Sequence, residues 1–311
     1  MSVHRALAPA KVNLGLFLGP RRSSDGRHQL VTVMQSISLA DELTLETVPD
    51  APGDEVRCPG VPGPPEANLA AVALRSFRAR TGWDAPPRRL TITKRIPVAA
   101  GLGGGSADAA AALRLAHHDS GLGDEALLSE LAAELGADVP AQVSPGRWLA
   151  TGAGEQLHEL PAPRPPLEVL VLPLVEALST AAVYQEADRL GLARGPADLD
   201  ERRRELAAAL QGGAAVPANE GLLHNDLQAA ALSLCPEIAA ALADVRRSGA
   251  VLALVSGSGP TVIGLFPREG AVDAEGRAPV EQAVRRLQGR VPAPSRASTV
   301  DNAFGKALSV G

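Results

Sequence analysis

KRIPVAAGLGGGSADAAAALRLAHH, residues 94–118, decides how the first half of this chain folds. An apolar run ends in a glycine-rich loop, and the loop opens into residues 108–118, which contain no glycine, proline or β-branched residue. Glycine lets the backbone turn with φ > 0 and bring N–H groups close to an anion, while a following helix directs its positive end at the same point. Ser106 is placed to cap that helix. The stretch predicts a strand, a phosphate-binding loop and a helix.

The loop differs from both common nucleotide-binding motifs. A Walker A loop needs a lysine after its last glycine, and here Ser106 and Ala107 follow Gly105. The dinucleotide fingerprint needs glycine at its sixth position, which is Ser106 when counted from Gly101. Two interpretations stay open for the loop alone: a polyphosphate site, or a plain glycine-rich turn between a strand and a helix.

Composition favours a soluble enzyme of two domains. The chain has 311 residues, of which 45% are hydrophobic and 21% charged, and no apolar run reaches the ~18 residues that span a bilayer. The N-terminus lacks the apolar core of a signal peptide, so we expect a cytoplasmic protein with no membrane partner. A net charge of -5 argues against a nucleic-acid partner. Cys58 and Cys235 lie in no C-x-x-C pair, so neither a zinc site nor a disulfide is expected.

Hydrophobic periodicity predicts an α+β fold. The first half shows runs of strands rather than regular strand–helix alternation. Its predicted elements are a strand at 6–19 entered through Pro9, a strand pair at 29–48, a helix at 69–81, a strand at 88–98 and a helix at 124–136. Residues 161–166, PAPRPP, form the best candidate linker.

The second half continues with mixed elements. The patterns predict a buried strand at 167–174, helices at 180–191 and 197–212, one or two helices at 226–249 with a break at Pro236, two strands around a glycine turn at 251–266, and a helix at 278–289. We found no internal repeat.

Three further segments carry candidate chemistry. Lys11 and Asn13 are two residues apart on a strand and therefore share a face. Asp138 follows a predicted helix in apolar surroundings, and SGSGPT at 256–261 is a second tight glycine turn. Taken singly, these are a solvated lysine, a turn aspartate and a hairpin.

Together with the loop, these segments resemble the GHMP small-molecule kinases, which carry an N-terminal P-x-K strand, a G-L-G-G-S-S type loop and a late glycine turn in this order. DGRH and GADVP are most similar to the branch that phosphorylates 4-diphosphocytidyl-2-C-methyl-D-erythritol in the non-mevalonate isoprenoid pathway. The resemblance rests on APAKVNL (8–14), DGRHQL (25–30), the block from residue 94, LGADVP (135–140), ATGAGEQL (150–157), LSTAAVY (178–184), HNDLQ (224–228) and VSGSGPT (255–261).

The resemblance implies a two-domain GHMP kinase fold, with an N-terminal ribosomal-S5-like domain at 1–160 that binds ATP and a C-terminal ferredoxin-like α/β sandwich domain at 161–311. Phosphoryl transfer depends on positioning and charge stabilisation, which suits these residues. The implied catalytic residues are Asp138, which accepts the proton of the attacking hydroxyl, and the adjacent cation Lys11.

The resemblance also implies the binding residues and cofactors. ATP and Mg2+ are the expected cofactors, with Ser106 as the candidate metal ligand. The implied ATP-binding residues are Asn68, Pro97, Gly101, Leu102, Gly103, Gly104, Gly105, Ser106, Ala107 and Asp108. The implied substrate-binding residues are Asn13, Arg27, His28, Thr180 and Tyr184.

At three positions the chain departs from the pattern. Arg27 stands where the branch usually has a tyrosine that stacks on the cytosine, and a guanidinium plane can stack on a base in the same way. Ala107 and Asp108 replace the usual Ser-Asn, so Asp108 places a negative charge near the nucleotide.

Two alternative functions are compatible with parts of the sequence. One is a GHMP kinase for another small alcohol, mevalonate or homoserine, against which DGRH and LSTAAVY argue. The other is a non-catalytic GHMP-fold binding protein, either a ligand sensor or an RNA binder. The presence of Lys11, Asp138 and the loop glycines argues against loss of catalysis, and the acidic net charge argues against RNA.

Overall fold

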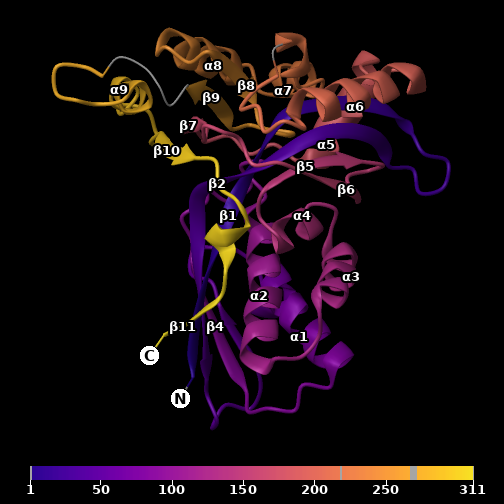
Figure 1. The fold of residues 1–311 in the computed structure, drawn as a ribbon, viewed down its shortest axis with the longest axis vertical. Helices are drawn as coiled ribbons and strands as arrows, with labels where there is room; N and C mark the ends of the chain where they lie inside the picture. The colour runs from indigo at the N-terminus through magenta and orange to yellow at the C-terminus, as the bar shows by residue number, and fades with distance from the viewer. Residues whose placement is uncertain (1, 218, 267–271, 311) are drawn as a thin grey trace.

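The computed structural model describes residues 2–217, 219–266 and 272–310, which form two β-sheets with helices packed on them (Figure 1). The first sheet is built on two long antiparallel strands, β1 (Val3–Arg21) and β2 (His28–Thr47). Its strand order is β11-β1-β2-β4-β3, and β5 and β6 continue from another part of β2. The partner strands are β3 (Glu55–Arg57), β4 (Arg88–Thr93), β5 (Arg147–Thr151), β6 (Gln156–Leu160) and β11 (Leu308–Val310).

The long strands change neighbours part-way along. β2 pairs with β4 through residues 42–47 and with β5 through residues 32–35, and the β1–β2 register shifts at Pro9/Ala10 between these two regions. Such bulges bend a strand and re-aim its side chains. The β1–β2 pair therefore contributes to two different parts of the sheet, one with β4 and one with β5. Lys11 lies just after the bend between them.

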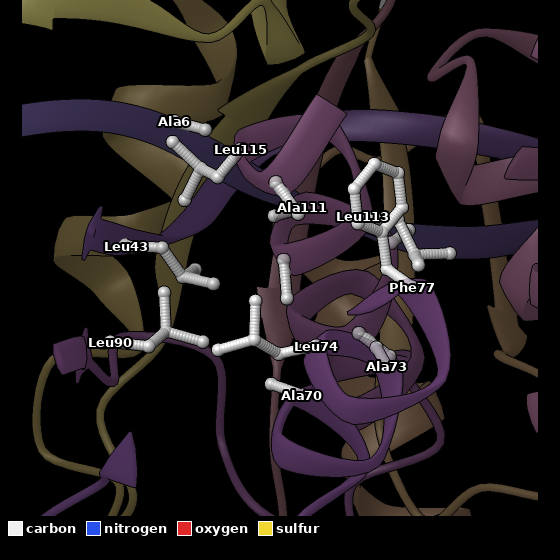
Figure 2. Close-up of a cluster of buried hydrophobic side chains, with 14 of the residues drawn as sticks. Ala6, Leu43, Ala70, Ala73, Leu74, Phe77, Leu90, Ala111, Leu113 and Leu115 are labelled. Carbon is white, nitrogen blue, oxygen red and sulfur yellow. The ribbon is translucent and has the colours of Figure 1, made fainter. Parts of the chain in front are cut away.

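Four helices lie on one side of the lower part of this sheet, together with a 3-10 turn at Pro65–Ala67 (Figure 1). They are α1 (Leu69–Thr81), α2 (Gly104–Ser120), α3 (Glu125–Leu135) and α4 (Val139–Val143). Alanines of α2 are fully buried, and Figure 2 shows Ala111 in the same cluster as Leu74, Phe77 and Leu90. Small side chains let the α2 backbone approach α1 and the sheet closely, which explains how a chain with 2% aromatic residues fills its core.

The second sheet has the order β10-β7-β9-β8. Its strands are β7 (Glu168–Leu172), β8 (Leu252–Val255), β9 (Val262–Phe266) and β10 (Ser295–Ser298). Around it lie α5 (Thr180–Leu190), α6 (Pro196–Leu210), α7 (Gln228–Leu234), α8 (Glu237–Arg247) and α9 (Pro279–Arg286), with a 3-10 turn at Glu220–Leu222. A further 3-10 turn, η3 (Asn302–Gly305), packs on β1 of the first sheet. α8 packs on β8 and β9, whereas α6 packs on β1, β2 and β5 and so bridges to the first sheet.

The chain leaves the first sheet after β6 and enters the second at β7, and then its C-terminal end returns. β11 pairs with β1 at the start of the chain, so the two termini lie close together in Figure 1. The domain boundary at 160/161 stays a prediction, with residues 161–166 as the connection. Within the described residues, no helix is both long and apolar enough to cross a membrane.

Most predicted elements are present, and three details were wrong. Pro9 lies inside β1 rather than at its entrance. Its nitrogen cannot donate a hydrogen bond, and the β-bulge between Pro9 and Ala10 interrupts the regular pairing there, so the proline is tolerated within the strand. The predicted strand pair at 29–48 is the single strand β2, since no turn residue interrupts the run. Ser106 is not the cap of α2. The helix begins at Gly104 after Gly103, whose φ of 70° starts it earlier.

Candidate active site

The glycine loop lies between two pockets. The larger pocket has a volume of about 690 Å³ and the smaller one about 480 Å³, and Gly101, Gly103 and Ser106 line both. The first N–H groups of a helix have no partner within the helix, so the start of α2 presents free donors and its positive dipole end here. Ser106 is in that first turn, which leaves its hydroxyl available to a ligand.

Close packing holds the loop in place. The Lys11 N–H donates to the Leu102 carbonyl at 2.9 Å, which ties the loop to β1. A Cβ at Gly101 would lie 2.7 Å from the Gly259 carbonyl oxygen, and a Cβ at Gly103 would lie 2.9 Å from Lys11 Cγ. Glycine is therefore required at both positions. The two glycine turns that are distant in sequence thus contact each other around the Lys11 side chain.

Lys11 and Asp138 form an ion pair at the wall of the larger pocket. Lys11 Nζ lies 3.4 Å from Asp138 Oδ2 and donates to Asn13 Oδ1 at 2.8 Å. Asn13 Nδ2 donates in turn to Thr32 Oγ1 at 2.8 Å. Lys11 is buried, whereas the Asp138 side chain is 40% exposed and faces the pocket beside the loop. The carboxylate is thus open to a ligand, and the ammonium that balances it is fixed.

Four of the residues expected to bind the substrate line the larger pocket. Arg27, His28, Thr180 and Tyr184 all line it. The rings of His28 and Tyr184 are 5.5 Å apart, and His28 Nδ1 contacts the Gly19 carbonyl at 2.8 Å. Burial raises the pKa of Tyr184 to about 12, and the negative charge of Asp138 adds to the shift, so its hydroxyl stays protonated. Arg27 is exposed and donates to the Ala153 carbonyl at 3.1 Å.

The smaller pocket lies on the other side of the loop. Asn68, Pro97, Leu102 and Asp108 line it together with Gly101, Gly103, Gly104, Gly105 and Ser106. The Asn68 side chain caps α1 by accepting from the Ala70 N–H at 2.9 Å. Ala107 lines neither pocket: it is fully buried in the core, and its N–H donates to the Gly103 carbonyl. Of the residues expected to bind ATP, Ala107 alone is kept from both pockets by its burial.

The negative charge of Asp108 is balanced by a lysine that the sequence reasoning missed. Lys94 Nζ lies 2.8 Å from Asp108 Oδ2 and 2.5 Å from Asp41 Oδ2. Burial alone would lower the pKa of Lys94, but the two carboxylates outweigh it and raise it. Burial, supported by Asp41 and opposed by Lys94, raises the pKa of Asp108 to about 7. The only sequence signal was a lysine that directly follows a strand and precedes the loop.

A second missed group supports the late glycine turn. Asn225, from the HNDLQ segment, donates from Nδ2 to the carbonyls of Val255 and Gly257, both at 2.8 Å. Thr180 Oγ1 lies 3.1 Å from Ser258 Oγ in the same turn. These contacts join α5 and the second sheet to the wall of the larger pocket, so both halves of the chain build the site.

The residues present fit a magnesium ion held mainly by its substrate. Within residues 2–217, 219–266 and 272–310, no group of three or more histidine, cysteine or acidic side chains could hold a metal. Mg2+ commonly keeps several waters and binds through phosphate oxygens with few protein ligands. The Ser106 hydroxyl, at the junction of the two pockets, suits that mode.

Comparison with known proteins defines the class. The model of the GHMP kinases N terminal domain matches residues 68–146, and the model of the GHMP kinases C terminal domain matches residues 205–287. Together they cover more than half of the chain, so the chain is a GHMP kinase. The first match contains the loop and Asp138.

Relatives narrow the class further. A 4-diphosphocytidyl-2-C-methyl-D-erythritol kinase of Anaeromyxobacter dehalogenans is 42% identical over 85% of this chain and 81% of its own length. The enzyme of the same name from Kineococcus radiotolerans is 44% identical over 83% and 79%. A crystal structure of 4-(cytidine 5'-diphospho)-2C-methyl-D-erythritol kinase superposes with a TM-score of 0.71 at 31% identity, covering 98% of this chain and 97% of the other. The chain belongs to the family of 4-diphosphocytidyl-2-C-methyl-D-erythritol kinases.

A structure of homoserine kinase from Cytophaga hutchinsonii superposes with a TM-score of 0.69, with 99% of this chain and 97% of the other covered, but at 16% identity. This likeness shows the shared fold alone.

Proposed function

We propose that this chain transfers the γ-phosphoryl group of ATP to the 2-hydroxyl of 4-diphosphocytidyl-2-C-methyl-D-erythritol, in the non-mevalonate pathway of isoprenoid precursor synthesis. The observation that carries the proposal is the Lys11–Asp138 pair at 3.4 Å, in a pocket that shares the glycine loop with a second pocket. Family membership provides the substrate class. The pathway step and the cytoplasmic location are part of the same proposal.

In this mechanism each pocket binds one of the two substrates. ATP occupies the smaller pocket, with its phosphates on the loop and the start of α2. The alcohol occupies the larger pocket, with its reacting hydroxyl at Asp138 and its cytosine between Tyr184 and Arg27. Because Ser106, Gly101 and Gly103 line both pockets, the terminal phosphate and the hydroxyl meet across the loop. This arrangement suits the in-line geometry of phosphoryl transfer.

Asp138 acts as the proton acceptor. Lys11, whose Nζ lies 3.4 Å from Asp138 Oδ2, can balance the negative charge that develops on the reacting oxygen atoms. The chain Lys11–Asn13–Thr32 fixes the ammonium, so little reorganisation is needed during the reaction. Mg2+, held through the phosphates with Ser106, would neutralise charge on the phosphate oxygens.

The test compares acceptors in one assay. Purified protein with magnesium-ATP should form ADP with the cytidyl substrate and not with mevalonate or homoserine. Asp138→Asn nearly preserves shape but removes the proton acceptor, so kcat should fall by about 10² or more while KM changes little. Turnover of homoserine or mevalonate but not of the cytidyl substrate would overturn the substrate assignment. A variant with more than about a third of wild-type kcat would show that Asp138 is structural.

A further inference from the structure

Arg114, on α2, donates hydrogen bonds to backbone carbonyls of three other segments of the chain. Its Nε donates to the Gly305 carbonyl at 2.8 Å, and its Nη2 donates to the Leu7 carbonyl at 2.8 Å. Its Nη1 donates to the Gln142 carbonyl and, at 3.5 Å, contacts the Val143 carbonyl. Burial lowers the pKa of Arg114 to about 10, so the side chain is still a cation at neutral pH.

Two of these contacts, those with α4 and with β1, lead to parts of the candidate active site. Gln142 and Val143 are the last two residues of α4, whose N-cap is Asp138. Leu7 lies four residues before Lys11 on β1. Arg114 itself belongs to α2, which begins in the glycine loop. One guanidinium thus joins the elements that carry the carboxylate, the ammonium and the phosphate site.

The contact with α4 has the most direct consequence. The final carbonyls of a helix have no partner within it, and a cation there is also favoured by the helix dipole. α4 has only five residues and spans about 7 Å at 1.5 Å per residue. In a helix so short the N-cap lies close to the end that Arg114 binds, so fixing the C-terminal end also fixes the N-cap Asp138.

The geometry points to Arg114 as a positioning residue that holds Asp138 at its distance from Lys11 and from the loop. The Gly305 carbonyl, in the C-terminal segment, helps in turn to hold the Arg114 guanidinium in place. This inference rests on the proposed function, because it assumes that Asp138 and Lys11 act in catalysis. Reacting groups misplaced by about 1 Å can lose on the order of 10²-fold in rate, so loss of this support should appear in kcat.

The chain offers a matched control in Arg147 on β5. Its guanidinium also binds backbone carbonyls, at Ala214 and Ala215, and donates to Gln35 Oε1 at 3.0 Å. Burial lowers its pKa to about 10 as well. Its bonds lead to the segment after α6 rather than to α4. Arg114→Lys and Arg147→Lys should therefore cost similar stability, but only Arg114→Lys should affect the reaction.

The experiment measures kcat, KM for both substrates and Tm for wild type, Arg114→Lys, Arg147→Lys and Asp138→Asn. We expect kcat of Arg114→Lys to fall about 10-fold or more, with KM for ATP within about twofold, because lysine cannot form the same set of bonds. Arg147→Lys should keep kcat within about twofold. Equal losses of kcat in the two lysine variants, or no loss in Arg114→Lys, would overturn the inference.

A second variant covers the case in which Arg114→Lys does not fold. A Cβ at Gly305 would lie 3.2 Å from Arg114 Nη2 and 2.8 Å from Pro145 Cγ, so Gly305→Ala should shift the Gly305 carbonyl without touching the charge. A kcat reduced about threefold or more supports the inference, and an unchanged kcat contradicts it. If Asp138→Asn keeps the kcat of the wild type, Lys11 and Asp138 are not the catalytic pair. That outcome contradicts the proposed function, whatever the result for the Arg114 variants.

Discussion

At the scale of single residues, the site depends on charges that are matched at short range. Lys11 balances Asp138 at the larger pocket, and Lys94 balances Asp108 and Asp41 at the smaller one. The second group accounts for the aspartate that stands where the family usually has asparagine. Burial is the main reason why the pKa of Asp108 is raised, and the neighbouring carboxylate of Asp41 adds to the shift, while Lys94 opposes it.

The raised pKa of Asp108 predicts a pH dependence of stability. Its pKa rises from 3.8 to about 7 on folding, so between these values the unfolded chain has lost a proton that the folded protein keeps. The contribution of Asp108 to stability therefore falls as pH rises from about 4 to about 7. Asp108→Asn has no such proton. The difference in unfolding free energy, variant minus wild type, should increase over this interval in urea titrations without nucleotide.

Asp200→Asn is the control, because Asp200 is fully exposed and Arg203 lowers its pKa. Its difference from wild type should stay flat above pH 5. A flat difference for Asp108→Asn as well would contradict the prediction.

The proposed cytosine site yields a second prediction for single residues. If Tyr184 and Arg27 cover opposite faces of the base, loss of either should weaken binding, since a stacked base is worth ~1–3 kcal/mol on alanine substitution. Tyr184→Ala should raise KM for the cytidyl substrate by about one to two orders of magnitude, and Arg27→Ala should raise it less. Arg27→Tyr should bind at least as well as wild type. KM for ATP is the internal control, and an unchanged cytidyl KM in Arg27→Ala would show that Arg27 does not contact the base.

At the scale of elements, the loop and α2 act as one unit. The helix of 17 residues begins at Gly104, directly after a left-handed glycine, and both its dipole and its free N–H groups point into the pockets. The same helix packs by its alanine face against α1 and the sheet. The proposed phosphate site and the packing of the core therefore share one element.

Alanine variants of Gly103 and Gly121, at the two ends of α2, distinguish the effect of backbone strain on stability from an effect on the site. Both have left-handed backbone, with φ of 70° and 68°, so alanine at either should cost roughly 1 kcal/mol of stability. A Cβ at Gly121 meets open space, whereas at Gly103 it meets Lys11 at 2.9 Å. Gly103→Ala should reduce kcat/KM for ATP about tenfold or more, and Gly121→Ala should leave it within about twofold. If the two variants lose the same Tm and keep the same kcat/KM for ATP, the site tolerates displacement of Lys11 and the prediction is wrong.

At the scale of the whole molecule, the site lies where both sheets and the C-terminal segment meet. The loop of the first half packs against the glycine turn of the second, and residues after β10 run back to pair with β1. A segment remote from the pockets in sequence, η3 at Asn302–Gly305, thus supports the helix that carries Asp138 through Arg114.

Two C-terminal truncations test this arrangement. Removing residues 308–311 deletes the exposed strand β11 but keeps the peptide carbonyl of Gly305, so Tm should fall slightly and kcat should stay within about twofold. Removing residues 301–311 also deletes η3. We expect kcat to fall about fivefold or more with little change in KM for ATP, measured in the same coupled assay. Similar kcat for the two truncations would show that η3 has no role in positioning.

The sequence by itself determined the local structure and the class of chemistry. The loop glycines, the alanine-rich helix and the helical spacing in residues 69–81 and 124–136 depend on neighbours in the chain, so they could be read without a structure. Lys11 and Asp138 could be predicted as candidate catalytic residues because the motifs around them are distinctive. Only the tertiary structure decided that Lys94 joins Asp41 to Asp108, that Ala107 faces the core and that Arg114 donates to the last carbonyls of α4. These facts depend on contacts between residues far apart in sequence, and local periodicity carries no information about which distant carbonyl or carboxylate a side chain will meet.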